Sequence, residues 1–354
     1  MHIPPRRQAG PAPGTPPGTG SGGHAGGGPE GGANRGARPF QPPLALVLGT
    51  GDIGSAIGRA LFLAGFGVAM LRDPGTPVLR RGMAFDDALE EGFAELDGVW
   101  ASRAPAVEAL APLAAGREAV AVAELDLAVV IAAWAALTGA SVWQDAGGRP
   151  PDVLPKILPE IVPEILPEIL VDARMRKYAA PADLRPLAGC ALGIGPGFAA
   201  TGNVDLAIET LPGREGALVA RGPTAAPTGR AVPLAGAGEE RFVYAPGAGP
   251  WTPALGIGAW VSAGAPIGLL GPRPVLAPID GAVRGMVRAM PNGIARGSKL
   301  LELDPRRDAP CTGVPPRARR IAEGVVHALA TLLPAAPLPA RRHAATARAL
   351  TPEA

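Results

Sequence analysis

The sequence is poor in the residues from which catalytic and metal sites are usually built. It holds 2 cysteines and 4 histidines in 354 residues. Two cysteines are too few for a disulfide framework or a self-contained zinc site, so we expect no metal site and a reducing, cytoplasmic location. No Ser–His–Asp or Cys–His arrangement is apparent, and we therefore assign no catalytic residue. Whether the chain is an enzyme stays open, with the balance against it.

Neither charge nor hydrophobicity is concentrated enough to indicate a nucleic-acid or membrane partner. The 33 Lys and Arg residues and 31 Asp and Glu residues give a net charge of +2, whereas nucleic-acid binding requires a clustered basic face. The most apolar stretch, residues 120–137, contains Glu124 and Asp126. It does not fit a membrane span, which needs about 20 nearly uncharged residues. The Pro/Gly-rich N-terminus also lacks the apolar core of a signal peptide.

Glycine and proline are abundant, with 50 and 43 residues, and they mark segments that we expect outside the folded core. Residues 1–42 and 334–354 are predicted to be disordered tails, because they have too little apolar surface to offset chain entropy. Residues 152–170 contain the four-residue repeat PKIL-PEIV-PEIL-PEIL. A proline at every fourth position excludes a helix interior and a central strand. We interpret this segment as a Pro-rich repeat insertion.

Residues 44–70 have the pattern of a buried strand, a glycine turn, a helix and a second strand. The helix is expected to begin near Asp52, directly after the turn. The glycine spacing is that of a dinucleotide-binding βαβ unit, which places Gly49, Gly51 and Gly54 in the turn. The first glycine permits a tight bend, the second lets backbone approach a phosphate, and the third lets the helix pack on the strand. We therefore predict a Rossmann-like domain over residues 43–212.

The pattern leaves the ligand of this turn open. Asp73, at the end of the second strand, is placed to hold the ribose hydroxyls of NAD(P), whereas Arg72 favours a nucleotide that carries a further phosphate. NAD(P) is therefore one candidate cofactor, and a nicotinamide-dependent oxidoreductase is one candidate function.

Charged residues and a second glycine loop follow the later strands of this domain. Ligands of open α/β sheets lie at the carboxyl ends of strands, and paired arginines can clamp a phosphate. The same arginines could instead pair with carboxylates of the next helix, in a solvated loop. We predict one anion-binding crevice, and its candidate cofactor-binding residues are Gly49, Gly51, Asp52, Gly54, Arg80, Arg81, Asp172, Arg174, Lys177, Gly195 and Gly197.

From residue 213 the pattern changes to short apolar strands alternating with Gly/Pro turns, as in an all-β module. Two copies of an apolar–x–x–Gly–x–x–apolar pattern flank the turn APIDGAV at residues 277–283. This arrangement resembles the biotinyl and lipoyl carrier domains, so residues 213–308 are predicted to be a biotinyl/lipoyl-like (barrel-sandwich hybrid) domain. The hairpin at residues 268–276 holds no lysine, so we expect no biotin or lipoate and a structural or docking role. Residues 309–333 are predicted to form a C-terminal helix.

Taken together, these motifs resemble the YqeB-type accessory proteins, described as selenium-dependent molybdenum hydroxylase system proteins. The matching patterns are GxGD, RRxMxFxxAxxEG, VDARMxK, GxGPGF, VDxAxET and DPRxDxxC. They extend the set of matching residues to Phe85, Asp205, Glu209 and Cys311. One departure is the sequence Pro212-Gly213-Arg214 after ET, where the family tends to have an R-G-H element.

The resemblance implies an accessory or maturation role for molybdenum hydroxylases, with the molybdenum cofactor (a pterin) as the expected ligand. Its implied partners are molybdenum hydroxylase subunits or cofactor-synthesis proteins. A non-catalytic interaction scaffold, docking through the lysine-free β domain, stays as a further alternative beside the oxidoreductase.

Overall fold

The glycine-rich stretch folds as its pattern predicts. In the computed structural model, which describes residues 42–73, 77–137, 167–178 and 181–332, it forms β1 (Leu44–Leu48), α1 (Asp52–Leu63) and β2 (Gly67–Leu71). Strands β1 and β2 pair in parallel. Every residue of β2 is buried, as expected for an apolar central strand. The local signal was strong because a strand, a turn and a helix all lie within thirty residues of sequence.

These strands belong to a nine-stranded mixed sheet with the order β10-β9-β7-β6-β1-β2-β5-β4-β3. Within this order, the strands from β9 through β7, β6, β1, β2 and β5 to β4 all run parallel to one another. The edge strands β3 and β10 are antiparallel. The further strands of this sheet are β3 (Phe93–Leu96), β4 (Val99–Arg103), β5 (Val120–Ala123), β6 (Ile169–Asp172), β7 (Cys190–Ile194), β9 (Leu206–Ile208) and β10 (Leu218–Val219).

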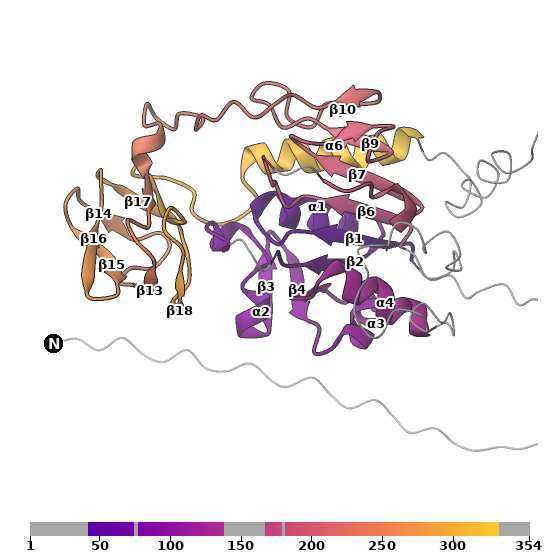
Figure 1. Ribbon diagram of the computed structural model, residues 1–354, viewed down its shortest axis with the longest axis horizontal. Coiled ribbons are helices and arrows are strands. Elements are labelled where there is room, and N and C mark those ends of the chain that lie inside the picture. The colour runs from indigo at the N-terminus through magenta and orange to yellow at the C-terminus, as the bar shows by residue number, and fades with distance from the viewer. Residues whose placement is uncertain (1–41, 74–76, 138–166, 179–180, 333–354) are drawn as a thin grey trace, which may run out of the picture. The chain divides into compact units, whose positions relative to one another are not determined.

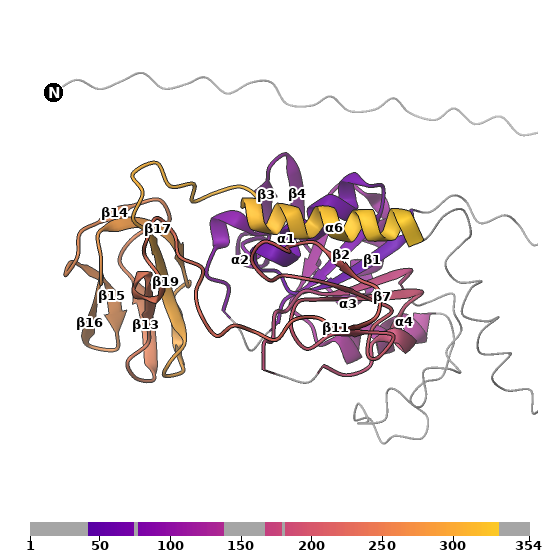
Figure 2. The same ribbon diagram turned by 90° about the horizontal axis from the view of Figure 1, so that it is seen from above.

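Helices cover both faces of the large sheet (Figures 1 and 2). Alternate residues of β1 enter two separate cores: Ala45 and Val47 pack with α1 and α6, and Leu46 and Leu48 pack with α3 and α4. The helices are α2 (Ala88–Glu91), α3 (Val107–Gly116), α4 (Leu127–Leu137) and α6 (Pro316–Leu332), with 3₁₀ turns η1 (Arg81–Met83), η3 (Arg185–Leu187) and η4 (Glu239–Arg241). Because α6 packs beside α1, the end of the chain completes the layer that its beginning started.

Residues 242–304 form two four-stranded antiparallel sheets, ordered β12-β19-β17-β14 and β16-β15-β13-β18. Trp251 is fully buried in their shared core, and its indole N–H donates to the Val287 carbonyl at 3.2 Å. The strands are β12 (Phe242–Tyr244), β13 (Gly249–Pro253), β14 (Trp260–Val261), β15 (Pro266–Leu270), β16 (Arg273–Leu276), β17 (Gly281–Met286), β18 (Met290–Ile294) and β19 (Lys299–Asp304); the small pair β8 (Ala199–Ala200) and β11 (Gly222–Pro223) stands apart.

The predicted fold class, a Rossmann-like domain followed by a biotinyl/lipoyl-like barrel, is wrong. A Rossmann fold consists of two βαβαβ halves, but the connections from β6 to β7 and from β7 to β9 contain no α-helix among the described residues. The strands instead extend into one large mixed sheet with antiparallel edges. The all-β part is not a separate barrel either, because the described residues from 42 to 332 group into one compact unit. Strand β10, from the region predicted to be all-β, pairs with β9 of the large sheet.

Several predictions fall on residues outside the described ranges. Nearly all of the predicted tail at 1–42 and the whole of the tail at 334–354 lie there. So does most of the predicted Pro-rich repeat at 152–170. The expected helix at 309–333 corresponds to α6. Among the described residues, no helix has the length and apolarity that crossing a membrane requires.

Candidate functional site

The glycine turn between β1 and α1 divides its glycines between two roles. Gly49 has φ of +103°, and a Cβ there would approach the Ala173 carbonyl oxygen to 3.0 Å. A Cβ at Gly54 would collide with the Gly49 carbonyl. Both are therefore required by packing. Gly51 differs, because nothing lies within 4 Å of its Cβ position. The backbone in front of α1 is thus open at this glycine.

Asp52, the first residue of α1, places a carboxylate at the positive end of the helix. Its Oδ2 accepts a hydrogen bond from Arg80 Nη1 at 2.7 Å. Burial raises the pKa of Asp52, but the charge and hydrogen bond of Arg80 and the amide of Ile53 outweigh it, so the pKa lies below its usual value. The carboxylate is therefore ionised and already compensates the helix dipole.

Arg80 binds a second carboxylate besides Asp52, that of Glu302 on β19. Its Nε donates to Glu302 Oε2 at 2.7 Å and its Nη2 to Oε1 at 3.1 Å. Glu302 is fully buried, and it also binds Arg241 and lies 3.6 Å from Arg284 Nε. Three guanidinium groups therefore share one buried carboxylate. This cluster joins the N-terminus of α1 to the antiparallel sheets.

More positive charge surrounds this cluster. Lys299 Nζ lies 3.7 Å from the centroid of the Phe242 ring. Burial lowers the pKa of Lys299, and Lys177, Arg80 and Arg241 lower it further, against the opposite effect of Glu302. The predicted residue Lys177 is therefore close enough to act on Lys299. The Phe242 ring covers part of Lys299, but both lysines are exposed overall, and no described carboxylate forms an ion pair with either.

Arg317, on the first turn of α6, reaches the same region. Its Nη2 donates to the Thr210 carbonyl at 2.8 Å. Burial lowers its pKa, Asp52 and Glu215 raise it, and Arg80 and Arg320 lower it, with a net decrease. Arg317 forms no ion pair with a described carboxylate. It therefore adds a further partly buried charge beside Asp52 and Arg80.

Positive charge is in excess in this group of residues, which we call the Glu302 cluster. Two further arginines at its edge are balanced: Arg320 binds Glu215, and Arg306, which binds Asp304 at 2.6 Å, also has Asp308 nearby. The remaining six cationic side chains are matched by three buried or partly buried carboxylates, which leaves three positive charges over; the exposed Glu240 also acts on Arg241. The cations are Arg80, Lys177, Arg241, Arg284, Lys299 and Arg317, and the carboxylates are Asp52, Glu302 and Asp304.

The second glycine loop connects to the Glu302 cluster through Thr210. A Cβ at Gly195, where φ is +79°, would meet Thr210 Oγ1 at 2.7 Å, and the Thr210 carbonyl binds Arg317. Gly197 is placed differently, since its carbonyl accepts from Asn203 Nδ2 at 3.1 Å. The structure thus brings Gly195 towards the first glycine turn but ties Gly197 to its own loop.

Arg81 does not join Arg80. Its Nε donates to the Met286 carbonyl at 3.0 Å, and its Nη1 donates to Asp87 at 3.1 and 3.2 Å. This is the pairing with the next helical segment that the sequence offered as the alternative to a phosphate clamp.

Asp172 and Arg174 lie at a second place, a small cavity at the carboxyl ends of β1, β2 and β5. Its volume of about 70 Å³ is far below the roughly 300 Å³ of a pocket for a drug-sized ligand. Arg174 lines this cavity. Asp172 does not, but it binds Arg174 at 2.5 Å. The cavity is lined by Leu48, Leu71, Arg72, Asp73, Leu125, Asp126, Leu127, Arg174 and Arg176.

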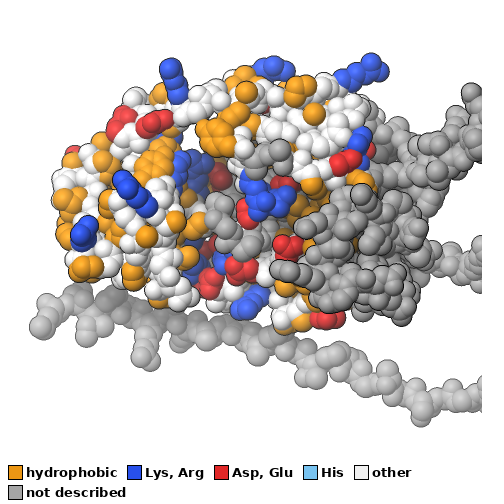
Figure 3. Space-filling model, viewed as in Figure 1, with side chains coloured by type: hydrophobic (Ala, Val, Ile, Leu, Met, Phe, Trp, Pro, Cys, Tyr) orange, Lys and Arg blue, Asp and Glu red, His pale blue; other side chains and the backbone are white. Residues whose placement is uncertain are grey.

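Each arginine of this cavity is already bound by carboxylates. Arg176 binds Asp73 at 2.6 Å, and Arg72 binds Asp86 at 2.8 Å and Glu90 at 3.0 Å. Thr50 Oγ1 completes this arrangement by donating to Asp86 at 2.5 Å. The cavity is therefore not cationic. In the space-filling view, basic and acidic side chains likewise adjoin in the middle of the face shown (Figure 3).

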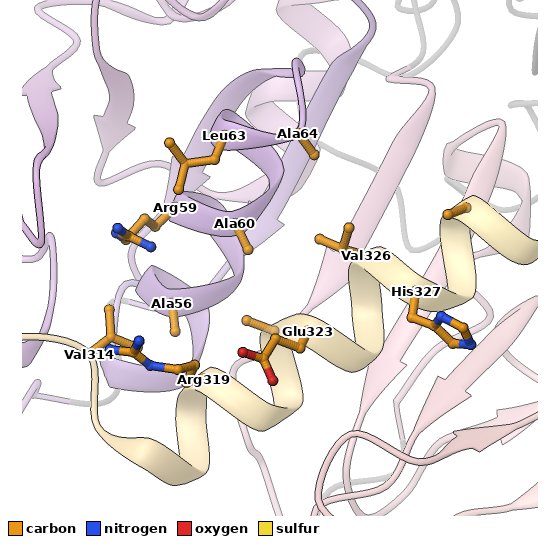
Figure 4. Close-up of a pocket in the computed structure, with 12 residues that line it drawn as sticks. Ala56, Arg59, Ala60, Leu63, Ala64, Val314, Arg319, Glu323, Val326 and His327 are labelled. Carbon is orange, nitrogen blue, oxygen red and sulfur yellow. The ribbon is translucent and has the colours of Figure 1, made fainter.

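A larger groove, of about 630 Å³, lies between α1 and α6 (Figure 4). Small side chains such as Ala56, Ala60 and Ala322 line it, with Arg59 and His327 among its polar residues. Among the described residues, no group of His, Cys, Asp or Glu side chains is arranged to hold a metal ion. Cys311 is buried, and burial raises the pKa of its thiol.

The sequence missed Arg241, Arg284, Lys299, Glu302 and Arg317. They lie on η4, β17, β19 and α6, more than a hundred residues beyond the glycine turn. One local signal was available for Arg317. The sequence PRARR opens α6 without an acidic residue in the first turn, whereas helix dipoles favour acidic residues there.

No family model matches the chain. Among solved structures, it is similar to a succinylglutamate desuccinylase/aspartoacylase from Rhodobacter sphaeroides, with 17% identity and a TM-score of 0.21, and to an aspartoacylase family protein from Mesorhizobium loti, with 13% identity and a TM-score of 0.23. Each alignment covers 74% of this chain and 85% of the other.

One curated relative is found by sequence. The chain is 28% identical over 296 residues to the uncharacterized protein YqeB of Escherichia coli (strain K12). The alignment covers 82% of this chain and 48% of YqeB, so the chain spans about half of the relative's length. The chain is therefore similar to YqeB over most of its own length, which confirms the YqeB-type resemblance indicated by its motifs.

Proposed function

We propose that this chain is a binding protein for a small phosphate-bearing ligand, held in front of the glycine turn by the Glu302 cluster. The observation that carries the proposal is the charge excess: six cationic side chains are matched by three carboxylates beside the open backbone at Gly51. Of the cations without a carboxylate, Lys177 and Lys299 are exposed and Arg317 is partly buried, and a partly buried cation is costly without a counter-charge. A bound anion would supply that counter-charge.

The geometry favours recognition by side chains over recognition by helix amides. The Asp52 carboxylate already lies at the N-terminus of α1 and offsets its dipole, so the helix amides contribute little to binding an anion in front of the turn. Lys177 and Lys299 are exposed beside Arg80, and ammonium groups bind phosphates as mobile point charges. These two lysines are therefore the expected direct contacts, with Arg80 held between Asp52 and Glu302 as a fixed charge.

The identity of the ligand extends this proposal. The YqeB resemblance points to the molybdenum cofactor and an accessory role for molybdenum hydroxylases, and the low cysteine content points to a cytoplasmic location. The nicotinamide alternative stays a prediction, and its ribose-binding candidate Asp73 is bound to Arg176 at 2.6 Å. Docking of a target enzyme by the antiparallel sheets is compatible with ligand binding.

The proposal is tested by titrating the purified chain with inorganic pyrophosphate and following the heat of binding. Gly51→Val is the decisive variant, because its side chain would enter the space where nothing lies within 4 Å, and the backbone there is extended. We expect Gly51→Val to abolish binding while leaving thermal stability nearly unchanged. Gly116→Val, at the end of α3 where space is equally open, is the matched control.

A Gly51→Val variant that binds pyrophosphate like the parent would overturn the proposed location. Absence of binding by the parent would overturn the function. For the pterin, the chain is purified from cells that synthesise molybdenum cofactor, oxidised and examined for pterin fluorescence. Repeated absence of pterin from a chain that binds pyrophosphate would leave a phosphate ligand of another kind.

A further inference from the structure

We infer that Lys299 is a reactive amine, which condenses with the carbonyl carbon of a phosphate-bearing aldehyde and holds it as an imine. This inference rests on the proposed function for the phosphate, and it takes up the case of a ligand other than the pterin. It follows from the scarcity of lysine in this chain, from the aromatic rings beside Lys299 and from the cations around it.

Lysine is rare in this chain, which uses arginine for nearly all of its positive charge. Only three of the 33 Lys and Arg residues are lysines, namely Lys156, Lys177 and Lys299. Lys156 lies outside the described residues, and the other two both belong to the Glu302 cluster. Arginine keeps its charge in proteins, whereas lysine can lose its proton and attack carbon. Lysines in a chain that otherwise uses arginine therefore point to the chemistry of a free amine.

The side chain of Lys299 lies against two aromatic rings of β12. Its Nζ is 3.7 Å from the ring centroid of Phe242 and 5.7 Å from that of Tyr244, which stands opposite Lys299 in the pairing of β12 with β19. Arginine is the commoner partner of an aromatic ring, so a charge alone would not require a lysine here. Tyr244 is 45% exposed. It offers a ligand a flat apolar surface beside the amine.

Positive charge next to Lys299 favours the neutral amine and attracts an anionic ligand. The guanidinium of Arg241 lies 4.2 Å from the centroid of the same Phe242 ring, so two cationic groups share one ring. The ring favours the ammonium form only weakly at an exposed site. Burial lowers the pKa of Lys299, and the neighbouring cations lower it further, against the effect of Glu302. The neutral amine is the nucleophile, and the same cations would hold the phosphate of the ligand.

The reaction needs no reactant besides the aldehyde. The lone pair of Nζ attacks the carbonyl carbon, the C=O double bond becomes a C–OH bond, and a proton of the amine passes to the new hydroxyl through water. This hydroxyl then leaves as water with the second proton of the nitrogen, and the C=N bond forms. Hydrolysis reverses both steps and releases the aldehyde and the amine. Nothing is oxidised or reduced.

Pyridoxal 5′-phosphate is the probe, because it combines an aldehyde, a phosphate and a flat ring, and because its imine is visible by absorption. The full chain is incubated with it near neutral pH, the imine is reduced with borohydride, and the labelled lysine is located by mass spectrometry of peptides. We expect more label at Lys299 than at Lys177 and Lys156 together. Pyridoxal, which lacks the phosphate, should label Lys299 roughly 10-fold less, the lower end of the enhancement that a charged cleft gives to an oppositely charged ligand.

Three variants examine the amine and the ring separately. Lys299→Arg keeps the positive charge over Phe242 and should lose the imine absorption. Tyr244→Leu removes the exposed ring and should lower the labelling about 2- to 10-fold, the range for one aromatic contact. Tyr178→Leu, at the other of the two tyrosines and 81% exposed, is the matched control and should behave like the parent.

Equal labelling of the three lysines would overturn the inference and leave the proposed function standing. Equal labelling of Lys299 by pyridoxal and by its phosphate would overturn the choice of a phosphate-bearing ligand. The proposed function is overturned separately, by absence of pyrophosphate binding, because the mass spectrum reports the amine and the heat of binding reports the phosphate.

Discussion

Glu302→Gln is expected to destabilise the chain strongly, because it removes the charge that three arginines share. Glu302 is fully buried, and its carboxylate binds Arg80 and Arg241 and lies 3.6 Å from Arg284. Glutamine has nearly the same shape and keeps one acceptor oxygen. The substitution therefore changes the charge balance with little change in packing, and the excess of positive charge in the cluster increases from three to four.

The magnitude follows from the cost of an uncompensated buried charge. Removing one partner of a buried ion pair typically costs about 3–5 kcal/mol. For proteins of roughly 150–250 residues, each kcal/mol corresponds to about 2–4 °C in melting temperature. We therefore expect a fall of about 6–20 °C, measured by thermal unfolding and checked by the free energy of unfolding in urea.

Glu239→Gln is the control, because Glu239 is an exposed carboxylate of η4 close to the same strands. An exposed substitution of this kind typically changes stability by no more than about 0.5 kcal/mol. If Glu302→Gln cost less than 1 kcal/mol, the three arginines would not depend on this carboxylate. The charge count behind the proposed site would then be wrong.

Three further predictions concern the glycine turn and the antiparallel sheets. Gly49→Ala should lower the free energy of unfolding in urea by about 1–3 kcal/mol, because φ is +103° and a Cβ would crowd the Ala173 carbonyl; a change below 0.5 kcal/mol would contradict this. The pKa of Asp52 is lower in the folded chain than its ordinary 3.8, so its ionised form stabilises the fold at higher pH and this contribution is lost as the pH falls through the folded pKa. The stability difference between the parent and Asp52→Asn should therefore shrink below about pH 4, and a difference constant from pH 7 to 3 would refute it. Trp251→Ala should cost about 3–5 kcal/mol in chemical denaturation, because the indole is fully buried between the antiparallel sheets, and a two-state transition unchanged from the parent would show that these sheets are not part of the cooperative unit.

The fold was predictable where the pattern was local and not where distant segments pair. Residues 44–71 gave a strand, a turn, a helix and a strand within a few residues of their observed bounds. The fold class failed because the sheet is completed by β9 and β10 and covered by α6, which starts more than two hundred residues after α1. Hydrophobic periodicity identifies one element at a time and does not show which elements become neighbours.

The same limit applies to the site. The glycine motif led to Gly51 and Asp52, and the arginine pair led to Arg80, because these residues lie close to one another in sequence. Their partners Glu302 and Arg317 come from β19 and α6, and only folding brings them to the turn. The motif Asp-x-Arg was a further local signal. It recurs at Asp172, Asp183 and Asp304, where each carboxylate binds the arginine two residues later.

A glycine turn therefore identifies a backbone shape more reliably than it identifies a ligand. Gly49 and Gly54 are required by the close approach of α1 to the ends of β1 and β6, whatever the turn binds. In dinucleotide-binding turns the helix N-terminus itself receives the phosphate. Here the Asp52 carboxylate occupies that end and is held by Arg80, whereas the cations without a carboxylate partner are Lys177, Lys299 and Arg317. A ligand recognised by them is selected by its charge and by side chains of the later strands and α6, which the turn alone does not reveal.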